Sequence, residues 1–104
     1  MGFVTAPSMA VARQLAHGLV EGKLAACVNL VPGLESIYVW QGKLAQEPEV
    51  LLIIKTTQGC WPALQDWVAQ NHPYEVPEVI QVPIQAGLPA YLTWVQTSVE
   101  LVKA

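Results

Sequence analysis

Residues 36–45 read Ser-Ile-Tyr-Val-Trp-Gln-Gly-Lys-Leu-Ala, and they point to two strands joined by a short turn. The run Ile37–Trp40 consists of β-branched and aromatic residues, which favour extended backbone. Gln41–Gly42 then predicts a turn, and Lys43–Ala45 leads the chain back. Gln-Gly is a weaker turn signal than Asn-Gly, so the turn type stays open. We therefore expect a β-hairpin in this part of the chain.

Extended segments flank the hairpin on both sides. The sequence predicts four of them: Gly2–Thr5, Ala25–Val31, Val50–Thr57 and Val79–Ile84. Val50–Thr57 is apolar at consecutive positions, which is typical of a central strand with apolar side chains on both faces. Pro83 interrupts the last segment and predicts a sheet edge or a strand end, because proline cannot donate a hydrogen bond to a neighbouring strand.

Three further segments carry apolar residues at helical spacing. The first begins at Ser8, a candidate N-cap, and Gly22 is its plausible C-terminal stop. The second is Trp61–Asn71, which Pro73 prevents from continuing. The third is Pro89–Val102, whose apolar side chains fall on one side at Leu92, Val95, Val99 and Val102.

The expected elements follow the order β-α-β-β-β-α-β-α, in which the hairpin contributes the middle strands. Without the hairpin extension and the last helix, this order reduces to βαββαβ, the split βαβ pattern of α+β proteins. No linker, low-complexity tract or charge run divides the chain. A chain of 104 residues is long enough for one domain and too short for two, so residues 1–104 are predicted to form a single domain.

The composition predicts an oligomer. Hydrophobic residues make up 53% of the chain, while charged residues make up 12%, against about 25% in soluble domains. A small domain with so few charges cannot cover its surface with them, so apolar surface should be buried between subunits. The four tryptophans agree with this, because aromatic residues are enriched in interface cores.

Several classes of protein are disfavoured by the sequence. The longest uninterrupted apolar run, Val50–Ile54, is far shorter than the roughly 20 residues that span a bilayer, so we expect no membrane partner and no signal peptide. A net charge of −3 with five basic residues argues against nucleic acid. Cys27 and Cys60 form no CxxC pair, and we expect a cytoplasmic protein with reduced thiols.

The polar chemistry of the chain is concentrated in residues 72–79, which read His-Pro-Tyr-Glu-Val-Pro-Glu-Val. A general acid–base pair between His72 and a glutamate is conceivable. In an extended segment, however, His72 and Glu78 would lie about 20 Å apart. No nucleophile elbow and no glycine-rich phosphate loop completes an active site. We therefore predict that the protein is not an enzyme.

Lys55 and the aromatic residues of the hairpin could each have a structural or a ligand-binding role. Alternation places Lys55 on the same face as Leu51 and Ile53. It is either a strand-end lysine whose stem packs, or a cation at a pocket edge that could pair with Glu78 or an anionic ligand. Tyr38 and Trp40 share a face as well, and packing in an interface is the favoured interpretation of these two aromatics.

Several motifs together resemble the CutA-like divalent-cation tolerance proteins. They are Ala25–Asn29, Ile37–Tyr38 with Trp40 and Gly42, Lys55–Thr57, His72–Tyr74, and Tyr91–Leu92 with Trp94. The resemblance runs from Thr5 to about Val95. It implies a ferredoxin-like fold assembled as a tight trimer, with hairpin strands pairing across subunits. It also implies a role in tolerance of copper and other divalent metals, without enzymatic activity.

The resemblance also bears on the metal and ligand sites. Copper ligands assigned in the family are a cysteine on the first strand and two histidines before Pro-Tyr, where this chain has Val4, Asn71 and His72. His72 is thus the one candidate ligand, and copper or another divalent cation should bind weakly at most. The alternative is a PII-like signalling or ligand-sensing trimer, in which an intersubunit cleft near Trp40, Lys55, Tyr74 and Glu78 would hold a small anion or a partner loop. A purely structural scaffold is a third hypothesis.

Overall fold

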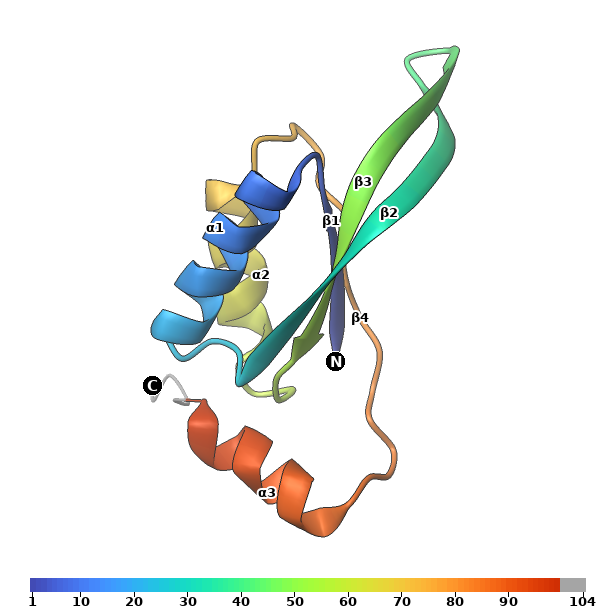
Figure 1. Cartoon of the computed structure of the whole chain (residues 1–104). Coiled ribbons are helices and arrows are strands. Elements are labelled where there is room, and N and C mark those ends of the chain that lie inside the picture. Colours follow the sequence, from blue (N-terminus) through green and yellow to red (C-terminus); the bar gives the residue numbers. More distant parts are fainter. Residues whose placement is uncertain (100–104) are drawn as a thin grey trace.

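A computed structural model of the chain describes residues 1–99. Its elements are β1 (Gly2–Ala6), α1 (Met9–Glu21), β2 (Cys27–Trp40), β3 (Lys43–Lys55), α2 (Trp61–Asn71), β4 (Val79–Gln81) and α3 (Pro89–Ser98) (Figure 1). The strands form one antiparallel sheet in the order β2-β3-β1-β4. This is the predicted ferredoxin-like α+β arrangement, with an extended hairpin and a C-terminal helix added to it.

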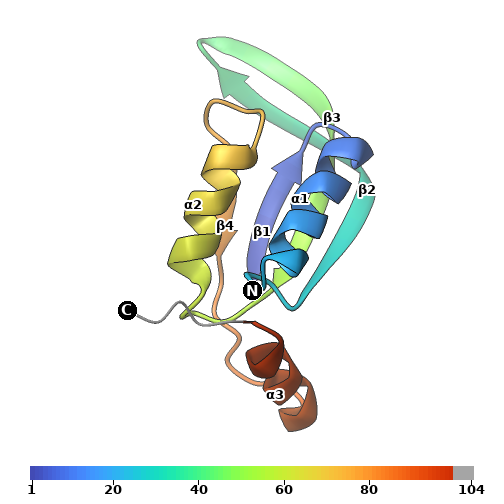
Figure 2. The same cartoon turned by 90° about the vertical axis from the view of Figure 1, so that its left-hand side faces the viewer.

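Helices α1 and α2 cover one face of the sheet (Figure 2). Ser8 is the predicted N-cap of α1, and its Oγ accepts a hydrogen bond from the Val11 N–H at 3.2 Å. The core lies between these helices and the inward side chains of the strands. Its fully buried members are Val4, Ala6, Ala12, Leu15, Leu19, Ala25, Leu52, Ile54, Leu64 and Val68, with Val50 nearly so.

The hairpin is longer and more continuous than the sequence predicts. Ala25–Val31 and Ser36–Trp40 were expected as separate segments, but β2 starts at Cys27 and joins them into one strand, which passes Pro32–Gly33 through a register shift between Val31 and Leu34. A bulge of this kind absorbs extra residues without ending the strand. Gln41 and Gly42 both have positive φ, +52° and +79°, as a type I′ turn requires, which settles the turn type.

The outer part of the hairpin, residues 35–48, is called the arm below. It projects beyond the rest of the sheet (Figure 1). Its apolar side chains are largely in solvent, and Ile37, Val39 and Leu44 are 64%, 67% and 74% exposed. No arm residue belongs to the core cluster of the described chain. The arm is therefore an apolar extension that the described part of the chain does not cover.

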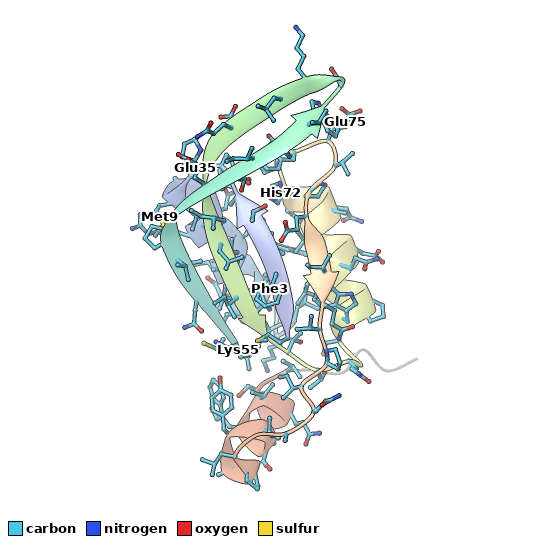
Figure 3. All side chains as sticks on the ribbon, turned by 90° about the vertical axis from the view of Figure 1, so that its right-hand side faces the viewer. Phe3, Met9, Glu35, Lys55, His72 and Glu75 are labelled. Atoms are coloured by element: carbon cyan, nitrogen blue, oxygen red, sulfur yellow. The ribbon has the colours of Figure 1, made fainter. Side chains whose placement is uncertain are left out.

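Among residues 1–99 no helix lies on the second face of the sheet, which is called the open face below. The strand register places Ile53 opposite Phe3 and Asn29, and Phe3 opposite Ile80, so these side chains share one side of the sheet. Figure 3 looks onto this side, with Phe3 on it. Ile80 is 51% exposed and Leu51 and Ile53 are half-buried. Strand β3 is central, as predicted, yet only one of its faces is covered within the chain.

Several predicted elements end earlier in the structure, among them the strand Val50–Thr57, which ends at Lys55. The last strand was expected over Val79–Ile84 but ends at Gln81, since Pro83 has no N–H to continue the pairing. The last helix was expected over Pro89–Val102, but α3 ends at Ser98 and Val99 is already extended. Val95 and Val99 are buried, as their spacing predicts. Val102 lies outside the described residues.

Candidate functional site

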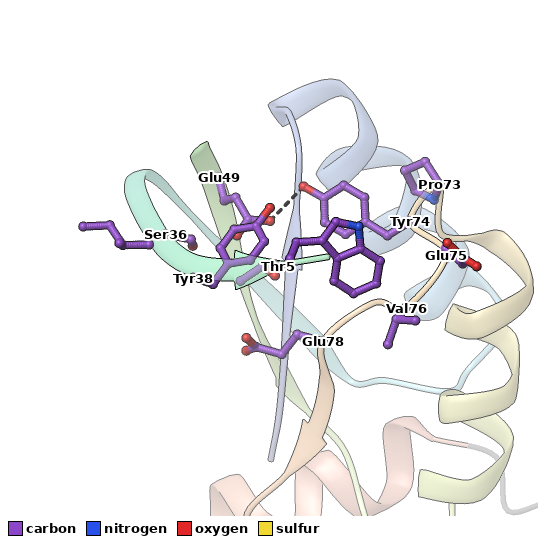
Figure 4. A pocket seen from close by; sticks show the side chains of 11 residues that line it. Thr5, Ser36, Tyr38, Glu49, Pro73, Tyr74, Glu75, Val76 and Glu78 are labelled. Atoms are coloured by element: carbon purple, nitrogen blue, oxygen red, sulfur yellow. Dashed lines mark hydrogen bonds between the residues drawn. The ribbon is translucent and has the colours of Figure 1, made fainter. Parts of the chain in front are cut away.

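A pocket of about 670 Å³ opens where the arm leaves the sheet. Strands β1, β2 and β3 form one side of it, and the segment between α2 and β4 forms the other. Figure 4 shows side chains from both sides around one hollow. The lining residues are Thr5, Ser36, Ile37, Tyr38, Trp40, Glu49, Pro73, Tyr74, Glu75, Val76 and Glu78.

The sheet register explains which strand residues reach the pocket. Tyr38 pairs with Ala45, and Trp40 pairs with Lys43. Lys43, Ala45 and Glu49 are all odd-numbered residues of β3, so their side chains point to the same side of the sheet. That side continues into the open face through Leu51. The expectation that Tyr38 and Trp40 share a face is therefore confirmed, and the pocket is the end of the open face nearest the arm.

His72 fixes the segment that closes the other side of the pocket. Its backbone is extended, at φ −85° and ψ 140°, so α2 ends there as Pro73 requires. Its Nδ1 accepts a hydrogen bond from the Tyr74 N–H at 3.1 Å, so Nε2 carries the proton and donates to the Thr5 carbonyl at 2.7 Å. The His72 ring also packs on Tyr74, with centroids 4.7 Å apart. The imidazole thus ties the loop to β1.

These contacts bear on the prediction that His72 is a metal ligand. Both ring nitrogens are used, so a metal ion could bind the ring only by displacing one hydrogen bond. Among residues 1–99, no group of three His, Cys, Asp or Glu side chains is placed to hold a metal ion. Metal binding at His72 stays a prediction, and the observed geometry gives this residue a positioning role.

Tyr74 and Glu49 form the polar centre of the pocket. The Tyr74 hydroxyl donates to Glu49 Oε2 at 2.8 Å (Figure 4). Glu49 is only 8% exposed. Partial burial raises the pKa of Tyr74 above its ordinary value of 10.0, and the hydrogen bond to Glu49 and nearby negative charge raise this pKa further. Tyr74 therefore remains a neutral donor that holds the Glu49 carboxylate in place.

The raised pKa of Tyr74 predicts a late phase in an ultraviolet titration of phenolate formation. Native Tyr74 keeps its proton at a pH where the unfolded chain releases it, so stability should fall as pH rises above 10.0. One of the three tyrosines should thus ionise late, and Tyr74→Phe should remove that late phase. A wild-type titration that is complete near pH 10, or one unchanged by Tyr74→Phe, would contradict this assignment.

The structure brings together three of the four predicted cleft residues. Trp40, Tyr74 and Glu78 line the same pocket. Lys55 lies at the far end of β3, where its Nζ donates to Asn29 Oδ1, and within the described residues it forms no ion pair with Glu78. Figure 3 shows Lys55 at the end of the sheet opposite to His72. A role for Lys55 in a cleft between subunits stays a prediction.

Sequence reasoning missed Glu49. The residue stands directly before the apolar run Val50–Ile54, and a carboxylate at the entrance of a buried strand was the available signal. Its partner Tyr74 is 25 residues away, so the pairing depends on the chain fold.

The family described as CutA1 divalent ion tolerance protein matches residues 1–98. The chain belongs to this family. The assignment agrees with the resemblance drawn from Ala25–Asn29, His72–Tyr74 and the other motifs.

Individual CutA relatives cover most of the chain. Protein CutA of Mus musculus is 50% identical over 100 residues, which are 96% of this chain and 56% of the mouse protein. The divalent-cation tolerance protein CutA of Thermus thermophilus is 50% identical over 93 residues, 89% of this chain and 90% of that protein. The chain thus spans little more than half the length of the mouse relative.

Solved CutA structures share the fold. The divalent cation tolerance protein from Thermus thermophilus superposes with a TM-score of 0.92 at 47% identity, covering 95% of this chain and 96% of that one. The PII-like protein CutA from Nostoc sp. superposes with a TM-score of 0.90 at 32% identity, covering 96% of each chain. Within residues 1–99, no helix has the length and apolar character needed to cross a membrane.

Proposed function

We propose that this chain is a divalent-cation tolerance protein that acts as a homotrimer in the cytoplasm, as a binding protein and not as an enzyme. Membership of the CutA1 family supports the tolerance role. The observation that supports a homotrimer is the open face. Its half-buried apolar strand residues continue into the exposed apolar side chains of the arm.

Assembly would remove the apolar surface that the chain itself leaves in water. Exposed hydrophobic patches of this extent mark interaction sites on soluble proteins. The arm and the open face are continuous through β2 and β3, so one neighbouring copy can cover both. Three copies around a common axis would then bury the open faces together, with the arms reaching across the boundaries.

The metal part of the proposal is weak binding of copper or another divalent cation at His72. A copper titration should give weak saturable binding to the wild type that His72→Ala abolishes, while His17→Ala, at an exposed histidine on α1, leaves the curve unchanged. Identical, non-saturating curves for the wild type and His72→Ala would remove His72 as a ligand. Untagged protein is needed, because an affinity tag that binds metal would mask the result.

The cellular role is tested by complementation. A bacterial strain that lacks its CutA protein and grows poorly in copper should recover when this chain is expressed. The His72→Ala variant separates the alternatives: loss of recovery supports metal binding at this residue, while full recovery assigns tolerance to another property of the protein. Failure of the wild-type chain to restore growth, although it is expressed and folded, would overturn the tolerance role.

The second candidate function is that of a PII-like trimer that senses a small ligand. The pocket at the base of the arm favours it, since aromatic walls with a few placed polar groups are typical of ligand sites. Trp40, Tyr74 and Glu78 would contribute to that site, with Lys55 added from a subunit boundary. A thermal-shift screen with nucleotides and metabolites tests this candidate, and the absence of any hit would count against it.

A further inference from the structure

The arm is attached to the sheet by two strands alone. Strand β1 pairs with β3 as far as Val50, which stands opposite Ala6. Beyond that point, within the described residues, β3 pairs only with β2, so the arm is a two-stranded ribbon, which is marginally stable by itself. Gln46 donates to Glu35 at 2.8 Å, which ties the two strands of the ribbon to each other and not to the rest of the chain. No arm residue is buried in the described chain, whereas Glu49, directly after the arm, is.

The backbone at the base of the arm has the features of a hinge. Two residues of β2, Pro32 and Gly33, stand opposite Val50 alone, so β2 carries a β-bulge here. Gly33 has φ +84°, a conformation that glycine adopts without steric cost. Pro32 and Pro48 lie on the two strands of the base, and neither has an N–H to donate to a partner strand. A few residues of this kind are enough to absorb a change of direction between two rigid parts.

One side-chain contact holds this base from outside the hairpin. The Tyr74 hydroxyl donates to Glu49 Oε2 at 2.8 Å, and Glu49 pairs with Leu34 at the inner end of the arm. Tyr74 belongs to the segment between α2 and β4, which His72 ties to the Thr5 carbonyl of β1. The hydrogen bond therefore joins the base of the arm to the body of the domain, and its ionised acceptor makes it a strong one.

We propose that the arm pivots about this base and that the Tyr74–Glu49 hydrogen bond is the latch that fixes its angle to the sheet. With the latch closed, the arm keeps the direction that Figure 1 shows. With the latch open, the arm swings as one body while the rest of the domain keeps its packing, because the core cluster contains no arm residue. Hinge and latch use groups of one chain. Only their consequence, that a latched arm is held ready to contact a neighbouring copy, rests on the proposed homotrimer.

The direct test measures N–H residual dipolar couplings of the isotope-labelled, full-length protein by NMR. In the wild type, the couplings of the arm and of the sheet should fit one alignment, because the latched arm and the sheet form one rigid body. Tyr74→Phe removes the donor and should shift the ratio of open to latched arms about tenfold or more toward open. The couplings of residues 35–48 should then shrink as a set, while those of α1 and α2 keep their wild-type values.

Two further variants assign the effect to the latch. Tyr91→Phe removes the same hydroxyl from an exposed tyrosine on α3 and should leave the arm couplings unchanged. Glu49→Gln keeps an acceptor for the Tyr74 hydroxyl, so its arm couplings should stay closer to the wild-type values than those of Tyr74→Phe.

The hinge has a matched pair of its own. Gly33 at the base and Gly42 at the tip have similar positive φ, +84° and +79°, and an added Cβ would meet no atom within 4 Å at either position. Alanine strains both backbones to a similar degree. Gly33→Ala should therefore change the direction of the whole arm, so that its couplings no longer fit the alignment of the sheet. Gly42→Ala should affect the turn alone.

Three results would overturn the proposal. Arm couplings that keep their wild-type values in Tyr74→Phe reject the latch, as expected if a second copy holds the arm by itself. A wild-type arm that does not share the alignment of the sheet rejects a fixed angle, and equal effects of Gly33→Ala and Gly42→Ala reject the hinge. The glycine pair still decides the hinge if Tyr74→Phe does not fold. Failure of the assembly is separate: a monomer whose arm is freed by Tyr74→Phe keeps the latch and rejects the trimer, whereas a trimer whose arm does not respond rejects the latch.

Discussion

Replacing Ile53 by glutamate should turn the protein into a folded monomer. Ile53 lies on the open face between Phe3 and Asn29, in the middle of the surface that we assign to the subunit boundary. Burying an unpaired carboxylate there would cost on the order of 3–5 kcal/mol per subunit, enough to dissociate the assembly at micromolar concentration. In the single chain the glutamate can reach water, so the fold should persist. Sedimentation velocity and circular dichroism together measure both properties.

Val20→Glu is the matched control for this substitution. Val20 is 42% exposed on α1, away from the sheet, so the same change of side chain should leave the oligomer intact. If Ile53→Glu remains as oligomeric as Val20→Glu, the open face is not the contact surface. If Ile53→Glu unfolds the chain, the substitution reports on the core, and Phe3→Glu on the same face would then be the informative variant.

Removing the arm should abolish assembly and leave the domain folded. Residues 35–48 can be replaced by Asn-Gly, which joins the paired residues Leu34 and Glu49 by a two-residue turn. The core cluster contains no arm residue, so the shortened chain should keep its helical circular dichroism and its cooperative unfolding. Its oligomer should be lost at micromolar concentration, because the exposed apolar side chains of the arm would be gone.

Leu52→Ala provides the contrast to the arm deletion. Leu52 is fully buried on β3, and its truncation should lower the free energy of unfolding by about 2–5 kcal/mol. Chemical denaturation should thus show a large loss of stability for Leu52→Ala and a smaller one for the armless chain, when both changes are made in the monomeric Ile53→Glu background. An armless chain that fails to fold, while Leu52→Ala folds normally, would show that the arm is part of the folding unit.

Local patterns were enough to predict most of the fold. Ser8 as N-cap, the helix Trp61–Asn71 and the stop at Pro73 depend on contacts within a few residues, and all three are found. The central position of β3 followed from its apolar run Val50–Ile54 in the same way. Local rules succeed at these positions because tertiary contacts reinforce them.

The strand boundaries could not be predicted from local rules. Pro32–Gly33 and Pro48 are ordinary strand breakers, yet β2 and β3 run through them because each strand is held by its partner along the hairpin. Similarly, β4 stops at Gln81, earlier than its apolar sequence suggests. For β2 and β3 the partner strand decides the boundary, and the sequence of one segment does not contain that information, whereas β4 is ended by Pro83 of its own segment.

The candidate site, too, could be predicted only in part from the sequence. Trp40, Lys55, Tyr74 and Glu78 were predicted to share a cleft between subunits; three of them line one pocket of the single chain, and Lys55 does not. Glu49 was missed, because its importance comes from burial and from a partner 25 residues away. Metal binding at His72 stays a prediction, and its link to the Thr5 carbonyl, which spans 67 residues and could not be foreseen locally, makes it a positioning residue for the pocket wall as well.

Sedimentation equilibrium of the untagged wild-type chain, at micromolar concentration and ordinary salt, tests the central claim most directly. The claim is that the open face and the arm are buried between copies of this chain. A single species of three times the 11.3 kDa chain mass is the predicted result. A stable species of 11.3 kDa across the concentration range would contradict it, since the apolar arm and open face would then remain in water.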